Sequence, residues 1–146
     1  MNNKLASSMN RYLSDLAVMY IKLHNLHWNV VGSDFKQVHE YLETLYDEVT
    51  ETLDEVAELM KIHGSQPMAS LKEYMAETKI EELPSQEIRT KDALLIVKDD
   101  LGELIKQAEV VRSDAQESDL YDVEDALEEQ LASYHKTLWF VGAMLK

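Results

Sequence analysis

The sequence predicts an all-α fold, a four-helix bundle with a short extra helix in the long connection between helices two and three. Three observations lead to this prediction. The 146 residues include only four Gly and two Pro, a scarcity that favours long uninterrupted helices over a sheet with many turns. Four segments repeat apolar residues at helical spacing. The length suits a single domain, so residues 1–146 are expected to form one folded unit.

The first helix is expected over about Lys4–Val31. Its apolar stripe consists of Met9, Leu13, Leu16, Tyr20, Leu23, Val30 and Val31. Gly32 should end this helix, because glycine readily adopts the left-handed conformation that follows a helix C-terminus. Ser33 or Asp34 can then cap the second helix, with Gln37 as a possible capping-box partner.

The second helix is expected to run to about His63, where Gly64 can end it and Pro67 blocks its continuation. The connection at residues 64–86 contains both prolines of the chain. Its amphipathic piece, Leu71–Ala76, is expected to form the short extra helix.

Helices three and four are expected over about Glu87–Ala115 and Asp122–Leu145. The links between helices one and two and between helices three and four are short, so each pair should form an antiparallel hairpin. The long link lies between helices two and three. A four-helix bundle with one long crossover has ferritin-like connectivity.

The composition excludes several classes of protein. A net charge of −14, from 28 Asp and Glu against 14 Lys and Arg, repels phosphate backbones and anionic lipid and suits cations better. Cysteine is absent, which excludes disulfides, thiolate metal sites and a cysteine nucleophile. No apolar run is long enough to span a bilayer, and the first twenty residues lack the apolar core of a signal peptide. A soluble cytoplasmic protein without a membrane partner is therefore expected.

Two histidines and three acids in residues 26–58 have the side chains that iron takes as ligands. They are His27, His39, Glu43, Asp54 and Glu58. On a helical wheel of about 100° per residue, the last four and Asp47 fall on one side of helix two, next to the apolar side. Such an acidic stripe is usually a solvated helix face. It lacks, however, the interspersed lysines that a solvent-facing helix uses for i,i+4 ion pairs.

His27 lies on the apolar stripe of helix one, where a histidine is more often a core residue than a ligand. Its neighbour Trp28 could likewise be ordinary packing. Because Gly32 lies near the turn between the two helices, His27 and His39 can nevertheless converge. The other histidines, His24, His63 and His135, are not assigned to the site.

His39 and Asp54 cannot hold one ion within a single chain, because fifteen residues of straight helix separate them by about 22 Å. Two arrangements remain open. Either the chain has two separate weak sites, or two copies of helix two pair antiparallel about a two-fold axis near residue 48. In the second arrangement each centre combines two half-sites: His27, His39 and Glu43 from one chain, and Asp54 and Glu58 from its mate.

The pattern H-W-x10-H-x3-E-x10-D-x3-E, from His27 to Glu58, resembles the ferroxidase signature of the Dps-type miniferritins. The turn at Gly32 and the four-helix layout of the whole chain add to the resemblance. It implies a cage of twelve subunits that oxidises Fe(II) to Fe(III) with hydrogen peroxide or dioxygen, stores a ferric mineral and limits oxidative damage. It also implies that the five ligands are shared between two subunits, with Trp28 beside them.

The resemblance further implies an iron entry channel near the start of the last helix. The candidates are Asp122, Asp125 and Glu129, with Asp119 and Glu128 as alternatives. Acids at a helix N-terminus also stabilise the helix dipole, so this structural role stays open as the alternative for Asp122 and Asp125. The remaining acids of the stripe are candidates for nucleating the mineral, with a solvated face as the alternative; they are Asp47, Glu51 and Glu55.

Three other functions remain open. A DNA-condensing stress protein with minor metal chemistry usually needs a lysine-rich extension, and only Lys4 precedes Arg11 here, so little direct DNA binding is expected. A helical bundle that serves as an acidic interaction module would leave the five-residue spacing as coincidence. A larger ferritin or a diiron oxygenase usually carries Glu-x-x-His motifs on two helices of one bundle, and none occurs in this chain.

Overall fold

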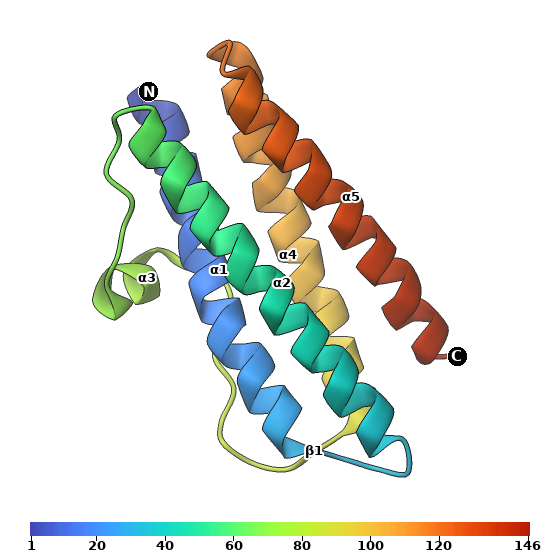
Figure 1. Cartoon of the computed structure of the whole chain (residues 1–146). Helices are drawn as coiled ribbons and strands as arrows, with labels where there is room; N and C mark the ends of the chain where they lie inside the picture. Colours follow the sequence, from blue (N-terminus) through green and yellow to red (C-terminus); the bar gives the residue numbers. More distant parts are fainter.

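A computed structural model describes all 146 residues and confirms the all-α four-helix fold. Its elements are α1 (Asn3–Asn29), β1 (Val30–Val31), α2 (Phe35–Ile62), α3 (Leu71–Glu77), β2 (Ile88–Arg89), α4 (Thr90–Glu117) and α5 (Tyr121–Met144). The four long helices form the bundle, and α3 lies in the long connection between α2 and α4 (Figure 1). Helix α1 packs against α2 and α4, and α4 packs against α5, so both expected hairpins are confirmed. No helix combines the length and the apolar composition needed to cross a membrane.

The expected end of the first helix was wrong by two residues. Helix α1 stops at Asn29, and Val30–Val31 form a short parallel pair with Ile88–Arg89, with Val30 opposite Ile88. The two valines continue the apolar periodicity of α1, but β-branched residues also suit an extended strand. Because Ile88–Arg89 belong to this pair, α4 begins at Thr90 and not at Glu87 as expected.

Gly32 forms the tight turn between β1 and α2. Its φ of +152° is disfavoured for other residues, and a Cβ there would lie 3.0 Å from Thr90 Oγ1. Asp34 occupies the N-cap position of α2 but makes no capping hydrogen bond, so the capping box with Gln37 is not formed. The Asp34 carboxylate instead accepts a 2.6 Å hydrogen bond from the Thr90 hydroxyl. The start of α2 is thereby tied to the start of α4.

The end of the second helix agrees with the prediction. His63 is the C-cap residue of α2, and Gly64 has a positive φ of 77°. The connection that follows is held against α1 by Asp15, whose side chain is fully buried. Its carboxylate accepts hydrogen bonds from the Thr78 hydroxyl at 2.8 Å and from the Lys79 N–H at 2.9 Å.

The core includes one chain of buried hydrogen bonds. The Tyr12 hydroxyl donates to Gln130 Oε1 at 2.8 Å, and the Tyr134 hydroxyl donates to Tyr12. Gln130 Nε2 then donates to Glu55 Oε2 at 2.9 Å. Burial raises the pKa of both phenols, so both remain hydrogen-bond donors at neutral pH. These bonds connect α1, α5 and the surface of α2.

A buried ion pair joins α1 to α4. Lys22 Nζ lies 2.8 Å from Asp100 Oδ2, and only 5% and 12% of the two side chains are exposed. Burial raises the pKa of Asp100, and the hydrogen bond from Lys22 offsets this only in part.

Candidate metal centre

The structure brings His27 and His39 into direct contact. His27 is near the end of α1 and His39 is in the first turns of α2, so the hairpin at Gly32 places the two rings together. Their centroids are 3.7 Å apart and their planes differ by 13°, a stacked arrangement. His27 is buried, as its place on the apolar stripe predicts, and His39 is partly exposed.

Two reciprocal hydrogen bonds fix the orientation of both rings. His27 Nδ1 donates to the His39 carbonyl at 2.7 Å, and His39 Nδ1 donates to the His27 carbonyl at 2.6 Å. A carbonyl oxygen can only accept, so each Nδ1 must carry a proton. This leaves Nε2 of each ring as the nitrogen that can bind a metal. A backbone carbonyl that accepts from the second ring nitrogen is also the usual support of a metal-binding histidine.

Glu43 completes this half of the site. It follows His39 by one helical turn, and its Oε1 lies 4.0 Å from His27 Nε2. The side chain is 56% exposed, so the carboxylate is accessible from outside the chain. An imidazole nitrogen and a carboxylate oxygen this close together are ligand types that a divalent transition metal takes.

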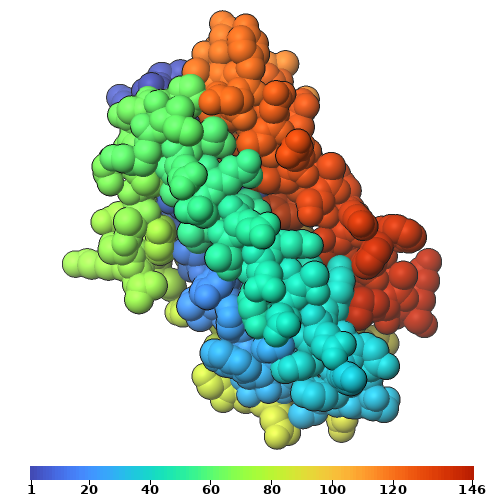
Figure 2. Space-filling model, viewed as in Figure 1, coloured from blue at the N-terminus to red at the C-terminus, as the bar shows by residue number.

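Asp54 and Glu58 lie apart from the histidine pair. Both are exposed on the same continuous helix, α2, which runs along the surface of the chain (Figure 2). They line an open hollow with Glu51, Glu55 and Ile62. No three His, Asp or Glu side chains of one chain come close enough together to hold a metal ion. The single chain therefore carries two incomplete sets of ligands.

Aromatic rings surround the histidine pair, and the sequence analysis missed two of them. Phe35 stacks on His39 with centroids 4.9 Å apart, and Tyr46 meets His27 edge-on at 5.2 Å. The Tyr46 hydroxyl donates to Glu43 Oε1 at 3.1 Å. Partial burial and the Glu43 carboxylate raise the pKa of Tyr46, so it remains a donor at neutral pH. The available signal was its position three residues after Glu43, on the same face of α2.

Trp28 is not an ordinary core residue, because 69% of it is exposed. Its ring lies edge-on to His24 at 5.5 Å, and within the chain it stacks on neither His27 nor His39. His24 in turn stacks on Tyr46 at 3.8 Å. Trp28 thus lies at the edge of the aromatic cluster, on a surface open to solvent or to another subunit.

The candidate channel and nucleation acids differ in their surroundings. Asp122 is not a free acid, because His63 Nε2 lies 2.9 Å from both of its oxygens. Partial burial alone would raise the pKa of Asp122, but the hydrogen bonds from His63 and from the Val123 N–H lower it. Asp125 and Glu129 are exposed on α5, and Asp47, Glu51 and Glu55 are exposed on α2. Among the α2 acids, Glu55 alone accepts a side-chain hydrogen bond from α5, donated by Gln130.

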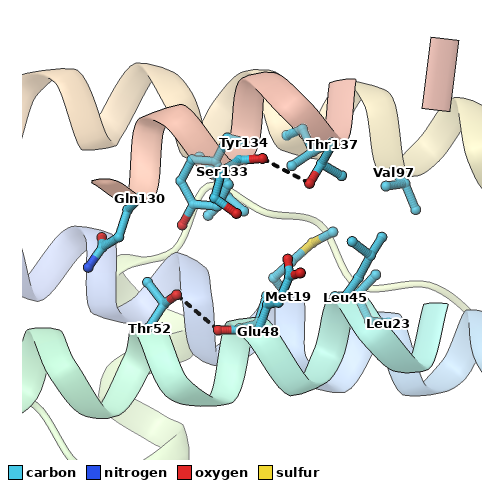
Figure 3. A pocket seen from close by; sticks show the side chains of 13 residues that line it. Met19, Leu23, Leu45, Glu48, Thr52, Val97, Gln130, Ser133, Tyr134 and Thr137 are labelled. Carbon is cyan, nitrogen blue, oxygen red and sulfur yellow. Dashed lines mark hydrogen bonds between the residues drawn. The ribbon is translucent and has the colours of Figure 1, made fainter. Parts of the chain in front are cut away.

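The bundle centre contains no metal-ligand set. A hollow of about 40 Å³ lies there, lined by residues of all four long helices (Figure 3). Its walls include Met19, Leu23, Val97 and Leu104, with Glu48 as the single acid and no histidine. Such a lining does not suit iron, which agrees with the absence of Glu-x-x-His motifs.

Comparisons with known proteins concern nearly the whole chain. A family model described as a ferritin-like domain matches residues 6–146. The antigen TpF1 of Treponema pallidum (strain Nichols) is 38% identical over 142 residues, which make up 97% of this chain and 80% of that protein. A DNA protection during starvation protein of Brevibacillus brevis is 33% identical over 142 residues, or 97% of this chain and 95% of that protein.

Solved structures show the same likeness. A Dps protein from Bacillus brevis superposes with a TM-score of 0.94 at 32% identity, and the match covers 100% of both chains. A DPS protein from Vibrio cholerae O1, described as a member of a broad superfamily of ferritin-like diiron-carboxylate proteins, has a TM-score of 0.93 at 25% identity. That match covers 98% of this chain and 89% of the other.

Proposed function

Because the chain belongs to the Dps-type miniferritins of the ferritin-like family, we propose that it is a ferroxidase that stores iron and limits oxidative damage in the cytoplasm. The observation that carries the proposal is the reciprocal hydrogen bonding of His27 and His39. It leaves two Nε2 atoms free, with the Glu43 carboxylate beside that of His27. This donor set suits Fe(II) as substrate.

We place the remaining ligands, Asp54 and Glu58, on a second subunit. Along α2, Asp54 is about 22 Å and Glu58 about 28 Å from His39, and both side chains are exposed and available to a partner. A two-fold axis near residue 48 would bring the acids of each chain to the histidine pair of its mate, giving two equivalent centres per dimer. The family resemblance extends this dimer to a closed cage of twelve subunits.

The proposed chemistry is the oxidation of Fe(II) by hydrogen peroxide, with dioxygen as the alternative oxidant. Each Fe(II) gives up one electron, and two Fe(II) with one peroxide and two protons yield two Fe(III) and two waters. Because the peroxide receives both electrons, hydroxyl radical is not released. Glu43, Asp54 and Glu58 would hold the ferric product, since carboxylates favour the higher positive charge.

We propose separate routes for entry and storage of the iron. Asp125 and Glu129 on α5 are exposed acids suited to an entry channel, whereas Asp122 would act there together with His63. Asp47, Glu51 and Glu55 would nucleate the ferric mineral on the surface formed by α2.

Anaerobic addition of Fe(II), followed by peroxide, tests the ferroxidase. In a Trp139→Phe background the fluorescence reports on Trp28 alone, since the chain has two tryptophans. We expect quenching on Fe(II) addition, a second change on peroxide addition, and at least about 100-fold weaker Fe(II) binding after His39→Ala. The exposed His135→Ala is the matched control and should behave as wild type. A protein that neither binds nor oxidises Fe(II) would contradict the proposal.

We also propose that the protein binds DNA weakly, although relatives carry the name DNA protection during starvation protein. The net charge of −14 opposes contact with phosphates. A gel shift with plasmid DNA at low salt and neutral pH should show no retardation at protein concentrations up to about 1 μM, where non-specific binding proteins already act. Retardation under these conditions would favour the DNA-condensing alternative.

A further inference from the structure

Tyr46 contacts the candidate metal centre through two different parts of its side chain. Its hydroxyl donates to Glu43 Oε1 at 3.1 Å. Its ring meets His27 edge-on, with centroids 5.2 Å apart and planes at 87°. One tyrosine of α2 therefore touches a ligand candidate on each of the two helices that build this half-site.

His24 supports the Tyr46 ring by stacking on it. The two rings stack with centroids 3.8 Å apart and planes that differ by 20°. His24 is itself held in place, because its Nδ1 donates to the Tyr20 carbonyl at 2.7 Å. The Tyr46 ring thus packs against two histidines of α1 that lie one turn apart.

We propose that Tyr46 is a positioning residue of the metal centre, which orients the Glu43 carboxylate through its hydroxyl and packs against the His27 ring through its own ring. This inference rests on the proposed function and deepens it. Tyr46 is not a ligand candidate itself. It acts through Glu43 and His27.

Glu43 needs such support because nothing else in the chain holds it. Its side chain is 56% exposed, and the Tyr46 hydroxyl is the one hydrogen-bond donor to its carboxylate. An exposed glutamate otherwise occupies several rotamers, and iron binding would have to select one of them at a cost in entropy. The bond to Tyr46 uses a lone pair of Oε1 and leaves the remaining oxygen lone pairs to the metal.

The contact is not needed for folding. Glu43 is exposed, so loss of the hydroxyl leaves no buried polar group without a partner. The ring carries the packing against His24 and His27, and phenylalanine preserves it. Tyr46→Phe therefore removes the positioning bond while it keeps the fold, and its thermal unfolding should match wild type.

Co(II) is the probe for the test, because it takes the same imidazole and carboxylate ligands as Fe(II) and absorbs visible light. In Tyr46→Phe we expect Co(II) affinity to fall about 10-fold, the usual effect of losing a group that supports a metal ligand. The Co(II) absorption bands should also change in position or intensity, because Glu43 binds in a different geometry. Tyr41→Phe is the matched control, since Tyr41 is on the same helix but packs near Phe140.

A double variant separates positioning from other effects. If Tyr46 acts on the carboxylate of Glu43, Tyr46→Phe should have little additional effect on Co(II) affinity or spectrum once Glu43→Ala has removed that carboxylate. An unchanged affinity and spectrum in Tyr46→Phe would overturn the inference and leave the ferroxidase proposal intact. Failure of the wild-type protein to bind Co(II) or Fe(II) at all would overturn the proposed function itself.

Discussion

Subunits with His39→Ala, assembled together with subunits with Asp54→Ala, are expected to recover the Fe(II) oxidation that neither variant has alone. Each variant retains the half-site that the other has lost. A mixed dimer then contains one centre with both defects and one intact centre. With random pairing, about a quarter of the wild-type centres should be restored. The measurement is the initial rate of Fe(II) oxidation by peroxide after the two variants are co-expressed or refolded together.

The matched control mixes His39→Ala with His27→Ala. Both residues belong to the same half-site, whose rings stack at 3.7 Å within one chain. Every centre in such a mixture keeps one defect, so no activity should return. Recovery in this control, or absence of recovery in the first mixture, would rule out centres shared in the proposed way.

The long helices could be predicted because their apolar periodicity is a local property of the sequence. The short strand Val30–Val31 could not, because its partner Ile88–Arg89 is 58 residues away and the same valines also continue the pattern of α1. The capping role of Asp34 failed for a similar reason. The hydroxyl of Thr90, 56 residues further along the chain, donates a hydrogen bond to the Asp34 carboxylate. That carboxylate would otherwise accept from a backbone N–H at the start of α2.

The candidate site likewise has features that the sequence predicts and features that it does not. The spacing of His39 and Glu43 follows from helix geometry, and the turn at Gly32 was enough to suggest that His27 approaches them. The reciprocal hydrogen bonds of the two histidines depend on how α1 and α2 pack, which periodicity does not specify. The pairing of Asp122 with His63 also joins distant segments, and it changes the character of a predicted channel acid.

Lys22→Met should lower the free energy of unfolding strongly, although Lys22 lies at a distance from the metal centre. Lys22 and Asp100 form a largely buried ion pair of 2.8 Å between α1 and α4. Removal of the lysine leaves a buried carboxylate without a counter-charge, a change that costs about 3–5 kcal/mol. The double variant Lys22→Met with Asp100→Leu should regain most of this, because apolar side chains tolerate the same interior. Denaturant unfolding at fixed subunit concentration measures both values.

The destabilisation caused by Lys22→Met should depend on pH. Burial raises the pKa of Asp100, so in wild type the folded state retains the proton above the ordinary aspartate pKa of about 3.9, where the unfolded state has lost it. Stability contributed by this group is therefore present below about pH 4 and is lost as pH rises through the folded pKa. Without Lys22 that pKa should rise further, so Lys22→Met should be less destabilised at pH 4 than at pH 7.

Lys91→Met, at an exposed position of α4 outside the ion pairs, should change stability little at either pH. A deficit of Lys22→Met that is equal at both pH values would show that lost packing, and not an unpaired charge, causes the destabilisation.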